Sequence, residues 1–200
     1  MAMLEYDERL FDTVFNKCLL QFGTDCTLTK VLGSLIKQVG TLWQVGAISV
    51  SNEHFISNLI KQKLFSIIDQ IMLPSEKEGV NSYILYLPAG ELHELGLLYL
   101  YYYLKKGGHR VIYLGQSVPL AYLKEAALRT NINRFVSIFT SSPRLEDVDE
   151  YFHQLQECLP PEQYHFFLTG MQCSNIEKVK KHTRNVTVLP DLETLIKHLK

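Results

Sequence analysis

The sequence has little net charge, few cysteines and no long apolar run, and each shortage excludes a class of protein. Its 20 basic and 21 acidic residues give a formal net charge of -1, so it lacks the basic surface that direct binding to a phosphate backbone requires. The four cysteines have no C-x-x-C spacing, which favours reduced thiols over zinc or disulfides. The longest apolar run, 95–104, is far below the roughly 20 residues of a membrane span. We therefore expect a cytoplasmic protein with no membrane part.

The common nucleotide-binding motifs are also missing. No G-x-G-x-x-G follows the first expected strand, and no G-x-x-x-x-G-K occurs anywhere. Binding of a dinucleotide or a triphosphate therefore loses its main sequence support. What remains is a chain of 200 residues, 46% hydrophobic and 20% charged, which is long enough to bury one sizeable core or two small ones.

The first part of the chain has helical periodicity. From Glu5 to about Leu73 the apolar residues recur every three or four positions, which predicts three amphipathic helices. Gly23, Thr24 and Asp25 separate the first helix from the second, and Gly46 follows the second. Ser49 is a suitable N-cap for the third. We therefore predict a helical bundle over residues 1–75.

From Asn81 onward, β-rich apolar runs alternate with helical segments. The expected strands are SYILYLP, RVIYLG, RFVSIFT, HFFLTG and VTVL, with helices near 91–106, 119–130, 145–158, 173–182 and 191–199. Strict alternation with short connections predicts a doubly wound, Rossmann-like or flavodoxin-like five-stranded parallel sheet over 79–200. Such sheets bind ligands at the carboxyl ends of their strands. The residues that follow the strands, 88–93, 115–118, 140–143 and 169–174, are therefore the candidate site.

A carboxylate and a histidine, Glu91 and His93, follow the first strand. Considered alone, His93 has three interpretations, namely a general base, a metal ligand or an ordinary surface residue. Neutral imidazole is a good metal ligand, and a carboxylate bonded to its other nitrogen sets its tautomer and increases its basicity. Glu91 is close enough in sequence to serve His93 in this way.

The spacing of three strand ends resembles the cobalamin-binding signature of methionine synthase and the corrinoid mutases, D-x-H-x-x-G, S-x-L and G-G. The matching residues are Glu91, His93, Gly96, Thr140, Ser142, Thr169 and Gly170. The resemblance implies that His93 is the lower cobalt ligand, that Glu91 orients its imidazole, and that Thr140 is the third member of this group. It also implies that the Ser and Gly motifs line the channel for the displaced nucleotide tail of the cofactor.

Four positions depart from that signature. Glu91 replaces Asp, Thr140 replaces Ser, Ser142 replaces Leu, and Thr169 replaces the first Gly. Ser142 and Thr169 are expected to narrow the nucleotide channel. A domain that has lost cobalamin and binds only a protein partner is therefore a further interpretation of the chain.

A second resemblance lies in the helical half, where Glu53 and His54 follow Trp43 by ten residues. In this spacing the chain is similar to cobalamin-dependent regulators of the MerR type, and the similarity implies that these residues contact the adenosyl upper ligand. Alternatively, Trp43 is ordinary core packing, and Glu53 is an acidic helix start with His54 incidental. The light-responsive regulators carry a histidine after the tryptophan, whereas this chain has Gln44.

Together the two resemblances imply an effector-sensing module without catalytic activity. It would bind adenosylcobalamin, form homo-oligomers, and contact DNA only through a winged-helix domain upstream of this sequence. The family's cap usually has four helices, so we expect that upstream residues are missing from this sequence or that the protein has lost them. A corrinoid methyl carrier of a methyltransferase system is the alternative function.

Overall fold

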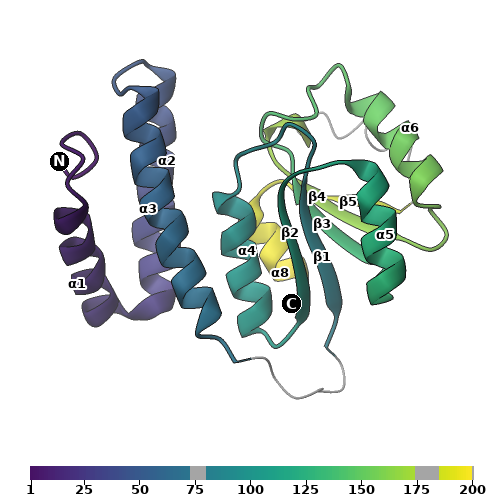
Figure 1. The fold of residues 1–200 in the computed structure, drawn as a ribbon, viewed down its shortest axis with the longest axis horizontal. Helices are drawn as coiled ribbons and strands as arrows, with labels where there is room; N and C mark the ends of the chain where they lie inside the picture. Colours follow the sequence, from purple (N-terminus) through teal and green to yellow (C-terminus); the bar gives the residue numbers. More distant parts are fainter. Residues whose placement is uncertain (73–79, 174–184, 200) are drawn as a thin grey trace. The chain divides into compact units, whose positions relative to one another are not determined.

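The chain folds as two compact units, Met1–Ser66 and Ile67–Lys200. The computed structural model describes residues 1–72, 80–173 and 185–199. The first unit is helical and the second is built on a sheet, which agrees with the change of periodicity in the sequence (Figure 1). The predicted domain ranges, 1–75 and 79–200, place the division somewhat later than these units do. No described helix is long and apolar enough to cross a membrane.

The first unit contains the helices that its periodicity predicts. They are α1 (Glu8–Cys26), a π-helical turn (Thr27–Leu32), α2 (Gly33–Gln44) and α3 (Val50–Asp69). Gly23 has φ 74° and ψ 170° and produces a kink inside α1, because this left-handed region of φ is readily available only to glycine. Gly46, with φ 69°, follows the end of α2. The three predicted helices are therefore present.

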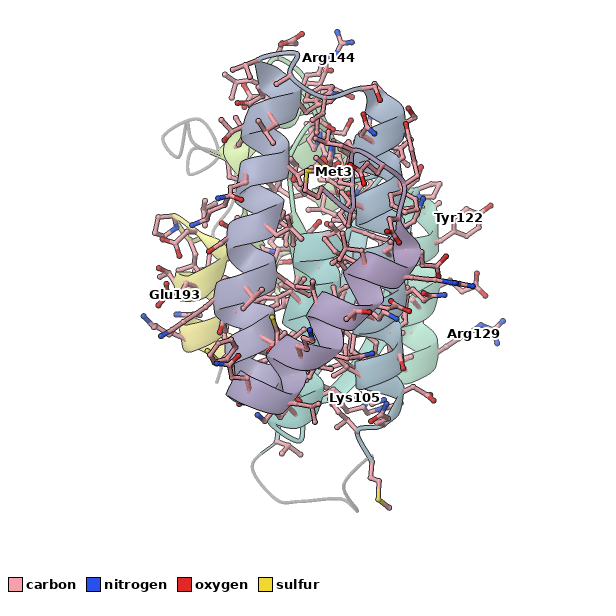
Figure 2. The ribbon with its side chains drawn as sticks, turned by 90° about the vertical axis from the view of Figure 1, so that its left-hand side faces the viewer. Met3, Lys105, Tyr122, Arg129, Arg144 and Glu193 are labelled. Carbon is pink, nitrogen blue, oxygen red and sulfur yellow. The ribbon has the colours of Figure 1, made fainter. Side chains whose placement is uncertain are left out.

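The start of α3 is held by side chains. The hydroxyl of Ser49 accepts the Asn52 backbone N–H at 3.1 Å, and Asn52 Oδ1 accepts the Ser49 N–H at 3.3 Å, so two free N–H groups at the helix start are satisfied. Tyr6 bonds the Ser51 hydroxyl at 2.8 Å and packs its ring on Phe55 at 5.3 Å. The N-terminal turn, in which Figure 2 labels Met3, is thereby attached to α3.

The second unit is a parallel five-stranded sheet in the order β2-β1-β3-β4-β5. Its strands are β1 (Ser82–Pro88), β2 (Arg110–Val118), β3 (Arg134–Ile138), β4 (His165–Thr169) and β5 (Val186–Val188). Its helices are α4 (Leu95–Lys106), α5 (Leu120–Thr130), α6 (Val148–Cys158) and α8 (Leu192–Leu199), with a 3-10 turn at Met171–Cys173. This is the flavodoxin-like strand order.

Helices cover both faces of the sheet (Figure 1). α4 and α8 pack on one face with Tyr83, Leu85 and Leu87, while α5 and α6 pack on the other with Ile84 and Tyr86. Because successive strand residues point to opposite faces, β1 contributes to both cores and is buried nearly throughout. The predicted doubly wound α/β fold is confirmed.

The differences from prediction lie at the ends of elements. The helix expected from residue 91 begins at Leu95 because 91–94 form a turn that holds the candidate site. The strand expected to reach Thr140 ends at Ile138. The helix expected at 173–182 lies almost entirely outside the described residues. All four cysteines are free thiols, and Cys173 is the buried one.

Candidate functional site

The centre of the candidate site is a fully buried carboxylate. Glu91 has no exposed surface, although it lies only three residues beyond the end of β1. Its Oε2 accepts backbone N–H groups from Thr140, Ser141 and Ser142 at 3.0, 2.6 and 3.0 Å. Its Oε1 accepts the backbone N–H of His93 at 2.9 Å and lies 2.6 Å from Nδ1 of the same residue. The carboxylate thus joins the turn after β1 to the loop after β3.

These contacts keep Glu91 ionised. Burial raises the pKa of its carboxyl group, but hydrogen bonds from the backbone of Ser141, His93 and Ser142 and from the His93 ring outweigh burial and lower the pKa from 4.5 to about 2. A carboxylate that accepts several N–H donors is expected to behave in this way. At neutral pH Glu91 is therefore an acceptor only.

An ionised Glu91 determines the tautomer of His93. Because the carboxylate carries no proton, the 2.6 Å contact to Nδ1 requires that this nitrogen donate its hydrogen. In the neutral imidazole the lone pair then lies on Nε2, at the other end of the ring. The His93 side chain is 61% exposed. Glu91 therefore fixes the orientation of the ring through Nδ1, while Nε2, the nitrogen that can bind a metal, remains accessible.

Ser141 is a member of the site that the sequence reasoning missed. Its hydroxyl lies 3.2 Å from each carboxylate oxygen of Glu91 and 3.4 Å from Nδ1 of His93. Thr140, expected to stand behind the histidine, contributes its backbone N–H instead. The resemblance named positions 140 and 142 and left the residue between them unassigned. The run T-S-S at 140–142 was the available signal, since any of its hydroxyls can turn toward a carboxylate.

The turn that carries Glu91 is anchored to the end of β2. Gly90, with φ 82°, donates its N–H to the Ser117 hydroxyl at 3.0 Å, and Ser117 donates its own N–H to the Glu91 carbonyl at 3.2 Å. A Cβ on Gly90 would lie 3.3 Å from the hydroxyl oxygen of Ser142. Glycine at this position therefore provides both the positive φ and the space next to the 140–142 loop.

Gly96 and Gly170, two further predicted residues of the second unit, lie where neighbouring segments approach closely. A Cβ on Gly96 would lie 3.1 Å from Ile138 Cδ1, so Gly96 allows α4 to approach β3 closely. A Cβ on Gly170 would lie 2.3 Å from the Phe139 carbonyl oxygen, and its φ is 120°, so no other residue fits there without rearrangement. Gly170 thus holds the tip of β4 against the chain that leads into Thr140.

Thr169 has a buried hydroxyl without a partner. The residue is 2% exposed, and within the described part of the chain its Oγ1 has no hydrogen bond. Buried polar groups are normally satisfied, and an exception calls for an explanation such as a water or a ligand. A group bound at the carboxyl edge of the sheet would supply the missing partner. Thr169 is therefore compatible with a ligand in this region.

The three predicted residues of the helical unit are accessible. Trp43 is 51% exposed at the end of α2, so interpreting it as ordinary core packing is wrong. Glu53 lies in the first turn of α3 and accepts the Ser57 hydroxyl, and its other oxygen lies 2.6 Å from His54 Nδ1. The His54 side chain is 69% exposed. An indole and a carboxylate–imidazole pair are thus available for contact with a ligand.

The side chains at His93 suit a metal ion that a macrocycle already holds. The part of the chain that the structure describes has no group of three or more His, Cys, Asp or Glu side chains able to share a bare ion. A single oriented imidazole is what a macrocycle-bound metal requires, because the ring supplies the other in-plane ligands, as with haem. The residues present at His93 and Glu91 fit the corrin group that the sequence resemblance implies.

Comparisons with known proteins agree with this fold. The B12 binding domain model matches residues 1–67. Two HTH-type transcriptional repressors of Myxococcus xanthus are similar in sequence: CarH, 31% identical over 160 residues, 80% of this chain and 52% of that protein, and CarA, 37% identical over 82 residues, 41% of this chain and 27% of that protein. The chain thus spans about half the length of CarH and a smaller part of CarA.

A solved structure supports the fold independently. The monomethylamine corrinoid protein of Methanosarcina barkeri matches with a TM-score of 0.75 over 99% of this chain and 93% of that chain. The sequence identity is 14%, so this likeness concerns the fold alone. It extends over both the helical part and the α/β part.

Proposed function

We propose that this chain, whose helical unit belongs to the B12 binding domain family, is the cobalamin-binding sensor module of a transcriptional regulator. The observation that carries the proposal is the pair Glu91–His93, in which a buried ionised carboxylate orients an exposed imidazole at the carboxyl edge of a doubly wound sheet. The effector is adenosylcobalamin, with its nucleotide base displaced and His93 in the base's place.

Each residue of the site has a defined task in this proposal. The bound cofactor supplies a cobalt ion that takes an imidazole as its lower ligand. His93 offers Nε2, Glu91 holds the Nδ1 proton, and Ser141 with the 140–142 backbone holds Glu91. The Thr169 hydroxyl and the backbone at Gly170 line the part of the edge where the nucleotide tail would lie. Trp43, Glu53 and His54 are the candidate contacts of the helical unit with the upper ligand.

The likeness to CarH favours a regulator over an enzyme module. CarH is a transcriptional repressor, and its similarity covers 80% of this chain. A net charge of -1 supports an arrangement in which another segment contacts DNA, namely a winged-helix domain beyond this sequence. Ligand binding to one arrangement of the chain stabilises that arrangement and shifts the oligomeric state. The proposed output is therefore a change in assembly.

The test is to incubate the purified chain with adenosylcobalamin in the dark and then remove free cofactor by gel filtration. We expect about one cobalt per chain to be retained, with an absorption spectrum that differs from that of the free base-on cofactor. Green light should then change both the spectrum and the elution volume. Failure to retain cobalt would contradict the proposal and would favour the lost-cobalamin interpretation raised by Ser142 and Thr169. Retained cobalt with no change in assembly would favour the methyl-carrier alternative.

Trp43→Ala tests the role of the helical unit. If the exposed indole contacts the adenosyl group, the change should weaken adenosylcobalamin binding about tenfold, the loss expected for an aromatic contact, and weaken hydroxocobalamin much less. Equilibrium titration of both cofactors measures the difference. Leu20→Ala, at a side chain that is 89% exposed on α1, is the control and should alter neither affinity. Equal losses for the two cofactors would remove Trp43 from the upper-ligand contacts.

A further inference from the structure

The amino edge of the sheet, opposite to the Glu91–His93 site, contains a cavity of about 600 Å³. Residues from the starts of β1, β3, β4 and β5 and from the end of α8 line it. All these elements belong to the second unit (Figure 1). The volume lies within the range of small-molecule sites. Because the strands are parallel, this cavity and the Glu91–His93 site lie at opposite ends of the same strands.

The cavity contains a cation, Arg134, that forms no ion pair with any described residue. Arg134, the first residue of β3, lines the cavity, and within the described residues it makes no ion pair and no side-chain hydrogen bond. Among the lining residues, Glu162 is the one carboxylate, and it is exposed. A guanidinium presents planar donors that match a carboxylate or a phosphate. An anionic group is therefore the expected partner of Arg134.

Two histidines near Arg134, His165 and His109, have lowered pKa values. Burial lowers the pKa of His165, and Arg134 and His198 lower it further. The ring is therefore neutral at neutral pH, and its Nε2 lies 2.9 Å from the Thr187 hydroxyl. Burial also lowers the pKa of His109, with a smaller contribution from Arg134 in the same direction. Among the described residues that line the cavity, Arg134 is therefore the permanent cation.

Flat rings and free amides complete the lining. Phe167 packs against His165 at 4.6 Å and against His198 at 5.6 Å between ring centroids, with the ring planes tilted by 43° and 51°, so three aromatic rings line one wall of the cavity. The side-chain amides of Asn81 and Asn133 also line the cavity and make no hydrogen bond within the described part of the chain. Rings of this kind stack on a planar ligand, and amides recognise polar ring edges.

We propose that this cavity binds a small planar anion, a heteroaromatic ring bearing a phosphate or a carboxylate and about the size of a nucleoside monophosphate. Arg134 takes the anionic group, the wall of Phe167 and the two histidines takes the ring, and the asparagine amides take its polar edge. The site would give the chain a second ligand independent of the first. It does not rest on cobalamin binding, and it can be tested in the cofactor-free chain.

The probe is adenosine 5′-monophosphate, titrated by calorimetry at pH 7 into the full cofactor-free chain. We expect a dissociation constant below about 1 mM, with Arg134→Gln weakening it at least about tenfold, as loss of a charge-assisted bond requires. Adenosine and inorganic phosphate should each bind at least about tenfold more weakly than the whole molecule. In ¹H–¹⁵N spectra, the largest chemical-shift changes on binding should occur at Asn133, Thr187 and His198.

The matched control is Arg129→Gln on α5, which removes the same charge from a side chain that is 78% exposed, paired with Glu125 and directed away from the protein in Figure 2. It should leave the affinity unchanged. Asn133→Ala, at an exposed residue, should lower the affinity for the nucleotide about fivefold. This variant replaces the Arg134 variant in the test if the latter fails to fold. No binding at millimolar concentrations, equal losses in the Arg134 and Arg129 variants, or phosphate binding as tightly as the nucleotide would each overturn the proposal.

Discussion

Replacing His93 by alanine should abolish histidine coordination of bound cobalamin. The variant incubated with adenosylcobalamin should lose the histidine-coordinated spectrum and retain the cofactor at least about 100-fold more weakly, because even residues that only orient a metal ligand typically contribute 10- to 100-fold. The cofactor-free variant should remain folded, because the His93 side chain is 61% exposed and surface changes rarely alter stability greatly. Absorption spectra after gel filtration, combined with thermal unfolding, measure both effects.

His153→Ala is the matched control for this prediction. Its side chain is 71% exposed on α6 and lies 3.6 Å from Glu157, so the variant removes an exposed imidazole beside a carboxylate elsewhere in the protein. It should leave the spectrum unchanged. An identical spectrum in the His93 variant and the parent chain would exclude His93 as the cobalt ligand and would contradict the proposed function at its centre.

Glu91→Gln should reduce stability and cofactor affinity together. The amide keeps the shape of the carboxylate but loses the charge, and its NH2 group must face backbone donors, either those of Ser141 and Ser142 or that of His93. A pKa lowered from 4.5 to about 2 corresponds to about 3 kcal/mol at neutral pH. Urea unfolding at pH 7 should show a loss of this order. Cobalamin affinity should fall about 10- to 100-fold because His93 is no longer oriented.

The pH dependence provides a second readout for the same variant. The folded pKa of Glu91 is below its ordinary value, so the carboxylate stabilises the fold fully above about pH 4.5, and this contribution is lost as the pH falls toward about 2. The stability difference between parent and variant should therefore shrink over that window. Glu193→Gln, at a surface residue that is 79% exposed (Figure 2), should show no such difference. A stability difference between parent and variant that stays constant from pH 7 to pH 3 would contradict the role assigned to the Glu91 charge.

The elements were predictable because their signals are local. Strands buried on both faces appear as continuous apolar runs, and β1 and β4 begin where those runs begin. The breaks at Gly23 and Gly46 follow from the freedom of glycine at positive φ. Strict alternation of strands and helices then leaves few topologies, and the flavodoxin-like order is among them. These features depend on neighbours within a few residues of one another.

The site was predictable in part. The spacing of Glu91 and His93 after β1 predicted a carboxylate–imidazole pair, and the structure has it at 2.6 Å. The spacing did not reveal Ser141, because β3 ends at Ile138 and the loop that follows turns a different hydroxyl toward Glu91. It also did not reveal that Trp43 is half exposed, since an apolar residue at helical spacing is equally compatible with a core position.

The sequence by itself determined the two-part architecture, the parallel sheet and the strand end where a histidine and a carboxylate meet, because these follow from periodicity and short spacing. Only the tertiary structure decided how completely Glu91 is buried, which N–H groups hold it ionised, and that Arg134 lines an amino-edge cavity without an ion pair to any described residue. The physical reason is common to all three. Burial, hydrogen bonding and electrostatic pairing depend on atoms far apart in the chain, and only folding brings those atoms together.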